Sequence, residues 1–341
     1  MPIDSIESLR THLQWALELE HSTIPPYLCA LYSIPEGTNP VATAVVRSVV
    51  MEEMLHMTLA ANVLNAVGGT PRLAESRLVA KYPAYLPHSD KRVHVHLLPL
   101  CREALETFLL IERPAPAGAP PQSNRYDTIG QFYEAIEIGL RAMVEQHGAS
   151  AVFKGKRSHQ VQPATWYYGG GGQVIEVHNL DTALAALREI TEQGEGYDGG
   201  ITDGDGRFDD VDELAHYYRF NELLLGRRYE PSDTEASGPT GDDLPVDWDV
   251  IAPMAPDPRS AKYRAYPTIH KQMVAFNRIY TRLLHQLQAA FTGTPSALRD
   301  AAPIMYELRY QAEALMRIPS PLHPGQTVGP AFEWDAHAMK R

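Results

Sequence analysis

Cysteine is scarce in this 341-residue chain, which contains only Cys29 and Cys101. Two cysteines cannot build the disulfide framework of a small secreted fold, and they are too few for a cysteine-ligated zinc or iron–sulfur site. We expect both to be buried apolar groups in a cytoplasmic protein. A hydrophobic content of 44% allows a sizeable core in a chain of this length.

Long apolar runs and clusters of basic residues are also missing. No uninterrupted apolar stretch reaches the roughly 18 residues of a membrane-spanning helix, and no charged segment followed by an apolar one opens the chain. We therefore expect neither a membrane span nor a signal peptide. The formal net charge is -12, and without a basic run such a chain is not expected to bind nucleic acid.

One motif, Glu-x-x-His, occurs twice in the sequence. Glu53 and His56 form the first copy, and Glu213 and His216 form the second. Each copy lies in a segment whose apolar residues recur with a helical period, so its carboxylate and imidazole share one helix face. Two such pairs, with one Glu from each of two further helices, form the ligand shell of di-iron and di-manganese carboxylate bundles.

The apolar periodicity predicts a mainly α fold, a ferritin-like four-helix bundle within residues 1–228. Its helices are expected at about 4–24, 41–67, 180–195 and 210–227. Pro25-Pro26 is expected to end or kink the first helix. Residues 72–178 are predicted to be a long insertion between the second and third helices, a crossover typical of ferritin-like folds.

Further helices and one strand are expected outside the four bundle helices. The insertion is expected to contain one clear helix near 127–147 and a short strand at 174–177. Residues 229–341 are predicted to be a linker and an additional helical pair, near 267–291 and 295–317, packed on the bundle rather than folding independently.

The other two ligands are expected to be one Glu on the first helix and one Glu on the third helix. Glu20 lies on the apolar stripe of the first helix, whereas Glu18 lies off it. On the third helix the stripe reaches Glu195. Glu192, Glu134 and Glu137 stay open as candidates for this third position.

Four carboxylates on inward-facing stripes would be costly to bury without compensating positive charge. Carboxylate oxygens and imidazole nitrogens suit iron or manganese ions. We therefore predict two metal ions, iron with manganese as the alternative, held by Glu20, Glu53, His56, Glu195, Glu213 and His216. Glu52 is expected to face solvent or to lie outside the ligand shell.

Four short phrases, at residues 19–28, 52–56, 193–196 and 216–220, resemble the ferritin-like domain of the iminophenylpyruvate dimer synthase family. That family includes enzymes of violacein- and rebeccamycin-type secondary metabolism that couple oxidised, tryptophan-derived imines. The resemblance covers about residues 1–230 and implies a non-haem metal centre. It supports, as site positions, Glu20, Glu53, His56, Glu195 and His216. The pigment-pathway synthases are much longer than this chain.

Together these features predict a di-metal oxidoreductase, an oxidase or oxygenase that uses O2 or peroxide on a small amine- or amino-acid-derived substrate. The insertion and the C-terminal helices favour an enzyme, because a substrate pocket needs walls beyond a bare bundle. The alternatives are a ferroxidase or iron-storage protein and a manganese catalase. A homo-oligomer is compatible with all three.

Overall fold

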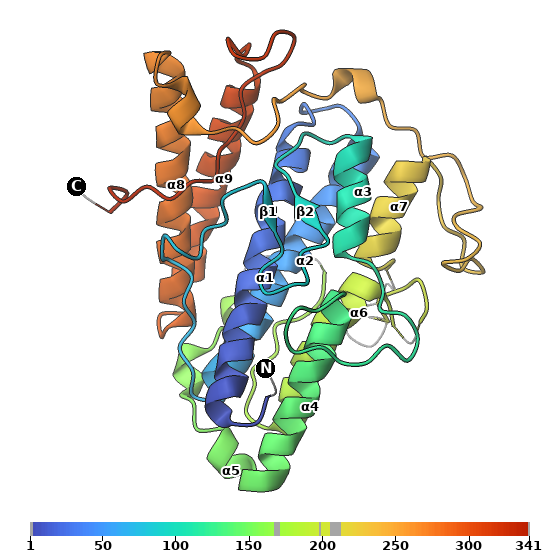
Figure 1. The fold of residues 1–341 in the computed structure, drawn as a ribbon, viewed down its shortest axis with the longest axis vertical. Helices are drawn as coiled ribbons and strands as arrows, with labels where there is room; N and C mark the ends of the chain where they lie inside the picture. The colour runs from blue at the N-terminus through green and yellow to red at the C-terminus, as the bar shows by residue number, and fades with distance from the viewer. Residues whose placement is uncertain (1–2, 167–170, 198, 205–212, 340–341) are drawn as a thin grey trace.

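Two long helices, α1 (Ile6–Tyr32) and α2 (Pro40–Ala66), run side by side through the middle of the molecule (Figure 1). The structure is a computed structural model that describes residues 3–166, 171–197, 199–204 and 213–339. The hairpin of α8 (Pro267–Phe291) and α9 (Ala297–Met316) lies on one side of this pair.

The opposite side of the α1–α2 pair is covered by elements from the middle of the chain (Figure 1). These elements are α3 (Arg102–Ile111), α4 (Ile129–His147), α6 (Leu180–Glu195) and α7 (His216–Leu225). The short α5 (Ala149–Val152) follows α4 at the lower end of the molecule in this view. A two-stranded antiparallel ribbon, β1 (Ala84–Tyr85) and β2 (His94–Val95), precedes α3. Short 3-10 helices lie at Arg157–His159, Pro163–Thr165, Trp248–Val250 and Ser260–Tyr263.

Side-chain caps and apolar stripes explain where the bundle helices begin and pack. Ser5, Thr128 and Asn179 each accept a hydrogen bond from the backbone N–H three residues later, at the starts of α1, α4 and α6. One apolar core runs through both sides of the α1–α2 pair, with members such as Leu13, Val49, Ile136, Leu187 and Phe276. The mainly α architecture predicted from the sequence is confirmed, with helix bounds for α2, α4, α6, α8 and α9 within two residues of expectation.

The first helix does not end at Pro25-Pro26, as predicted, but continues to Tyr32. A proline within a helix removes one backbone hydrogen bond and leaves the carbonyl four residues earlier without its donor. For Pro26 that carbonyl belongs to Ser22, and the hydroxyl of Tyr82 donates to it at 2.7 Å. A side chain from the insertion therefore supplies the bond that proline cannot make.

Two further expectations were wrong. Residues 174–177 form no strand, because side chains take the place of a partner strand: Gln160 bonds both backbone groups of Val177, and Asn62 bonds the carbonyl of Ile175. The last bundle helix begins only at His216; its expected start at residue 210 lies outside the described residues. Residues 213–215 are extended, and their backbone bonds to residues 201 and 203.

Candidate metal centre

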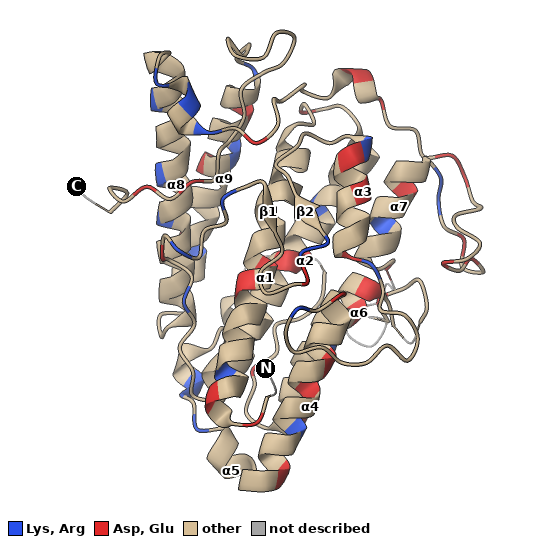
Figure 2. Cartoon of the chain, viewed as in Figure 1, with Lys and Arg blue, Asp and Glu red and all other residues tan. Residues whose placement is uncertain are grey.

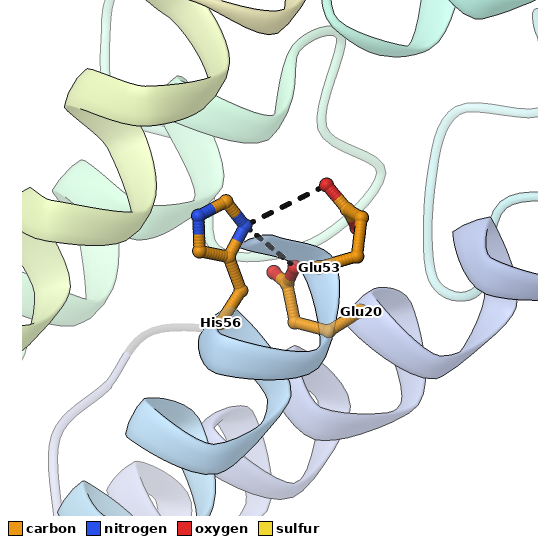
Figure 3. Close-up of side chains that lie close together, drawn as sticks. All are labelled: Glu20, Glu53 and His56. Carbon is orange, nitrogen blue, oxygen red and sulfur yellow. Dashed lines mark ion pairs between the residues drawn. The ribbon is translucent and has the colours of Figure 1, made fainter. Parts of the chain in front are cut away.

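The first half of the centre combines Glu20 of α1 with Glu53 and His56 of α2 (Figure 3). The Nδ1 atom of His56 lies 3.6 Å from an oxygen of each carboxylate. All three side chains are buried. Figure 2 shows acidic residues halfway along α1 as well as in its first turn.

The second half combines Glu53 with His216 at the start of α7 and Glu112, which follows the last residue of α3. His216 Nδ1 lies 3.1 Å from Glu53 Oε1 and 3.5 Å from Glu112 Oε2. The rings of His56 and His216 stack with their centroids 5.3 Å apart. Glu53 therefore belongs to both halves and joins them into one centre.

Both imidazoles are held by their outer nitrogen. His56 Nε2 lies 2.9 Å from Gln193 Oε1, and His216 Nε2 lies 2.8 Å from Glu52 Oε2. An amide oxygen and a carboxylate only accept hydrogen bonds, so both Nε2 atoms donate. Gln193 keeps its oxygen toward His56 because its own NH2 group points to Glu189, at 3.3 Å.

When the imidazoles are neutral, this arrangement leaves a lone pair on each Nδ1, the nitrogen that faces the carboxylates. His216 Nδ1 is buried and has no hydrogen-bond partner among the described residues. A buried polar atom without a hydrogen-bond partner is rare in native proteins. Metal-binding histidines are typically held in this way, with one ring nitrogen on the metal and the other N–H donating to a carboxylate or carbonyl. The donor set and its orientation therefore fit a metal.

Glu52 holds His216 from outside the ligand groups, which is the second of the two alternatives expected from the sequence; it does not face solvent. Its carboxylate is fully buried and also accepts a 2.7 Å bond from Arg219 Nη1. Burial alone would raise the pKa of Glu52, but the charges of Arg219 and His216 outweigh burial and lower it to about 2. Glu52 thus stays ionised and orients the imidazole.

A hydroxyl group donates a hydrogen bond to each carboxylate of the centre. Thr23 donates to Glu53, Tyr27 to Glu112, and Tyr133 to Glu20. Thr23 and Tyr27 belong to α1, and Tyr133 belongs to α4. These bonds fix the direction of each carboxylate before any cation binds, which lowers the cost of ordering the ligands.

The charge balance of the centre also suits cations. Burial disfavours the charged imidazole of His56, but Glu20 and Glu53 outweigh burial and raise its pKa to about 10. Neighbouring carboxylates likewise raise the pKa of His216 against the effect of burial. In the metal-free protein, protons on the imidazoles therefore partly neutralise the carboxylates, and bound metal ions would replace those protons.

Glu195 borders the centre without joining either half. It lines a small cavity together with Glu20, Glu53, His56 and Glu112. Its two oxygens accept hydrogen bonds from the backbone N–H groups of Ala115, at 2.9 Å, and Gly130, at 2.6 Å. Burial raises the pKa of Glu195 to about 7, although these two N–H groups oppose the rise. Its predicted role as a ligand stays a prediction.

Glu213 is not brought to the centre. Its side chain is 46% exposed and pairs with Arg219 at 3.1 Å. The spacing argument is wrong here because Glu213 precedes the helix, so it does not share a helical face with His216. The rival candidates for the third helix, Glu192, Glu134 and Glu137, belong to neither half of the centre.

The fold and the centre can now be compared with known proteins. The model of the ferritin-like family matches residues 13–225, well over half of the sequence. The chain belongs to the ferritin-like family. A solved ferritin-like protein from Caulobacter vibrioides shares the fold, with a TM-score of 0.60 at 21% identity, covering 98% of this chain and 100% of that one.

Two curated relatives of this ferritin-like chain are enzymes by name. Dichlorochromopyrrolate synthase from Lentzea aerocolonigenes is 26% identical, covering 98% of this chain and 36% of that protein. The 2-imino-3-(indol-3-yl)propanoate dimerase from Chromobacterium violaceum is 25% identical, covering 96% of this chain and 34% of that protein. The chain thus spans about a third of the length of the curated relatives it matches. These similarities confirm the resemblance inferred from the sequence motifs.

Glu112 is the one member of the centre that sequence reasoning missed in this ferritin-like chain. The insertion was expected to contain a helix only near 127–147, so α3 was not recognised. The signal that could have found Glu112 is local: it comes directly after Ile111 and four residues after Phe108, both buried on the inner face of α3. A carboxylate that continues a buried stripe is the same pattern that selected Glu20.

Proposed function

We propose that the chain is a non-haem di-metal oxidoreductase that uses O2 or peroxide on a small amine- or amino-acid-derived substrate. The observation that carries the proposal is the shared Glu53, flanked by two imidazoles whose Nδ1 atoms face carboxylates and whose Nε2 atoms are held from outside. Two iron ions are the expected cofactor, and manganese suits the same donors.

Each half of the centre would hold one ion. Glu20 and His56 would bind the first, Glu112 and His216 the second, and Glu53 would serve both. A pair of such ions supplies the redox chemistry with O2 or peroxide that side chains alone lack. The protein would supply the geometry, through Thr23, Tyr27 and Tyr133 on the carboxylates and through Gln193 and Glu52 on the imidazoles.

A substrate would approach between α4 and α6. An outer cavity of about 230 Å³ lies there, lined in part by Tyr133, Glu134, Thr191 and Glu195. Thr191 and Glu195 also line the small cavity at the centre, so they form the boundary between the two spaces. We assign the outer cavity to the substrate and this boundary to the passage toward the metals.

The names of the relatives support the substrate class. One is named for an imino acid, 2-imino-3-(indol-3-yl)propanoate, and the other for chromopyrrolate formation. Because this chain corresponds to about a third of each, coupling of two imino acids is not carried over. An amine- or amino-acid-derived substrate is the part of those names that we adopt.

Metal analysis combined with oxygen uptake tests the proposal. Protein purified without chelator should contain about two Fe or Mn per chain, and oxygen uptake should appear only when an amino acid or imine is added. Glu53→Ala should lose the metal, because both halves lose a ligand, whereas Glu134→Ala, at an exposed glutamate on α4, should retain it.

Three results would contradict the proposal. Less than half an equivalent of metal in the wild-type protein would remove the metal centre itself. Rapid disproportionation of peroxide by a manganese form would instead indicate a catalase. Large iron-loaded shells on size-exclusion chromatography would indicate a storage protein.

A further inference from the structure

The α8–α9 hairpin lies on the opposite side of the α1–α2 pair from the metal centre (Figure 1). A second cavity is lined by residues of these four helices. Its volume is about 470 Å³, larger than the outer cavity near the metal centre. Among the described residues that line it, none is a member of the metal centre. The cavity is therefore a separate space that the proposed oxidoreductase chemistry does not use.

The walls of this cavity are aliphatic and adaptable. Four methionines line it, three from α2 and one from α9: Met51, Met54, Met57 and Met305. Five leucine side chains from α1 and α8 also line it, and the rings of one histidine and three tyrosines belong to the wall as well: His21, Tyr32, Tyr280 and Tyr306. Methionine is unbranched and flexible, so it adapts to ligands without a rigid shape. The methionine and leucine side chains provide flexible apolar walls along which a hydrocarbon chain could pack.

Two arginines stand where the aliphatic cavity meets a second, more polar one. The polar cavity, of about 340 Å³, is formed around the loop between α1 and α2, and Arg47 and Arg309 line both spaces. Arg47 is exposed and makes no ion pair with any described residue. Arg309 bonds Glu313 through Nε, at 2.7 Å.

We propose that this pair of cavities binds an aliphatic carboxylate, such as a medium- or long-chain fatty acid. The hydrocarbon chain would occupy the methionine-lined cavity, and the carboxylate would lie between Arg47 and Arg309. Arg47 and Arg309 are the basic residues of the polar cavity, which Glu36 also lines. Their guanidinium groups would attract a carboxylate locally although the chain as a whole carries a net charge of -12. The inference does not depend on the proposed oxidoreductase function.

The site lies on the back of the metal-binding helices. Met54 and Met57 each adjoin a member of the metal centre along α2, and His21 adjoins Glu20 along α1. His21 is buried and bonds the hydroxyl of Tyr280, on α8, at 2.7 Å. A bound hydrocarbon chain would therefore pack against the same two helices that present Glu20, Glu53 and His56.

A fluorescence titration with 11-(dansylamino)undecanoic acid tests the proposal on the full chain. We expect saturable binding that decanoate reverses. Binding should strengthen by about fourfold for each methylene added between octanoate and dodecanoate, as burial of a methylene predicts. Equal affinity across this series, or the absence of saturable binding, would overturn the proposal. A preference for 2-naphthoate over decanoate would overturn the assignment of a flexible chain.

The role of the arginine is tested with Arg47→Gln and a matched ligand. We expect this variant to bind the acid about tenfold more weakly than the wild type, because a charge-assisted hydrogen bond is lost. It should bind the primary amide of the probe as the wild type does. Arg77→Gln, at an exposed arginine outside both cavities, is the control. Equal losses in both variants, or for both ligands, would contradict the proposal.

A third variant tests the location. Met51→Trp should abolish probe binding by filling the cavity while the circular dichroism spectrum stays unchanged; Met305→Phe serves if Met51→Trp does not fold. Unchanged binding in a folded filling variant would place the probe elsewhere and overturn the proposal. A dimer that binds no probe until it is diluted to monomers would assign the cavity to an interface between copies of the chain.

Discussion

At the scale of single residues, the question is whether Glu112 or Glu213 is the carboxylate that binds metal beside His216. Sequence spacing selected Glu213, whereas the structure places Glu112 beside His216 and Glu53. We expect Glu112→Gln to lower the bound metal to about half of the wild-type content, because one half of the centre loses a carboxylate. Glu213→Gln should retain full metal content, measured by elemental analysis. The reverse pattern would restore the ligand assignment made from spacing.

Glu195 gives the protein a pH dependence that can be separated from metal binding. Its pKa in the folded state is raised to about 7 by burial, so the folded protein binds this proton more tightly than the unfolded chain does. The contribution of Glu195 to the stability of the metal-free protein should therefore be lost as the pH rises from about 4.5 to 7. A side chain at this position that cannot ionise should not make this pH-dependent contribution.

We expect Glu195→Gln to remove about 1–3 kcal/mol of that decline in the free energy of unfolding, measured by urea denaturation at several pH values. The two proteins are compared by the slope of the free energy of unfolding against pH, not by its absolute value, because the substitution also removes a hydrogen bond from Ala115 or Gly130. Glu134→Gln, at an exposed position, should keep the wild-type slope. Parallel curves for wild type and Glu195→Gln would show that Glu195 is ionised at low pH.

At the scale of secondary-structure elements, α1 depends on a contact from outside itself. Pro25 and Pro26 lie inside the helix, and the Ser22 carbonyl that Pro26 leaves free accepts a bond from Tyr82. Tyr82→Phe leaves that buried carbonyl without a donor, and we expect a loss of about 1–3 kcal/mol in the free energy of unfolding. Tyr310→Phe, at a tyrosine that is 67% exposed, is the matched control for urea denaturation. Equal stability of the two variants would show that water serves the carbonyl equally well.

The elements that were predicted well share one property. In α2, α6 and α8 the apolar stripe and the flanking glycines or prolines lie within the element or next to it, and α6 also has the side-chain cap of Asn179. The start of α7 was predicted poorly because residues 213–215 have a competing partner: their backbone pairs with residues 201–203. Local periodicity carries no information about such a partner.

At the scale of the whole molecule, the α1–α2 pair separates two spaces with different chemistry. Glu112, directly after α3, and residues of α4, α6 and α7 complete or surround the acidic centre, whereas residues of α8 and α9 line the aliphatic cavity. These two groups of helices lie on opposite sides of the α1–α2 pair (Figure 1). None of the helices in the described ranges is both long and apolar enough to cross a membrane. One pair of helices thus supports both proposed sites, each from a different face.

Metal removal should lower the thermal stability of the whole fold. Cations that bind only the folded state stabilise it by mass action, by about 4 kcal/mol when the free metal exceeds its dissociation constant a thousandfold. We expect chelation to lower the melting temperature by roughly 5–15 °C, measured by calorimetry. A variant with both His56→Ala and His216→Ala should melt at the same temperature with and without chelator. A chelator effect of equal size in that variant would place the stabilising metal elsewhere.

The sequence by itself determined the bundle and the part of the centre that lies within helices. Glu20, Glu53 and His56 could be found because spacing along a helix decides which side chains share a face. Only the tertiary structure decided the rest: Glu112 reaches the centre through packing between segments far apart in sequence, as its bond from Tyr27, 85 residues away, shows. Both Glu195 and Glu213 were assigned from helical periodicity. In the structure, the backbone N–H groups of Ala115 and Gly130 bind the carboxylate of Glu195. Glu213 lies in an extended segment paired with residues 201–203, and its side chain points outward. The direction of a side chain at the end of a helix depends on what packs there, and no local period encodes that.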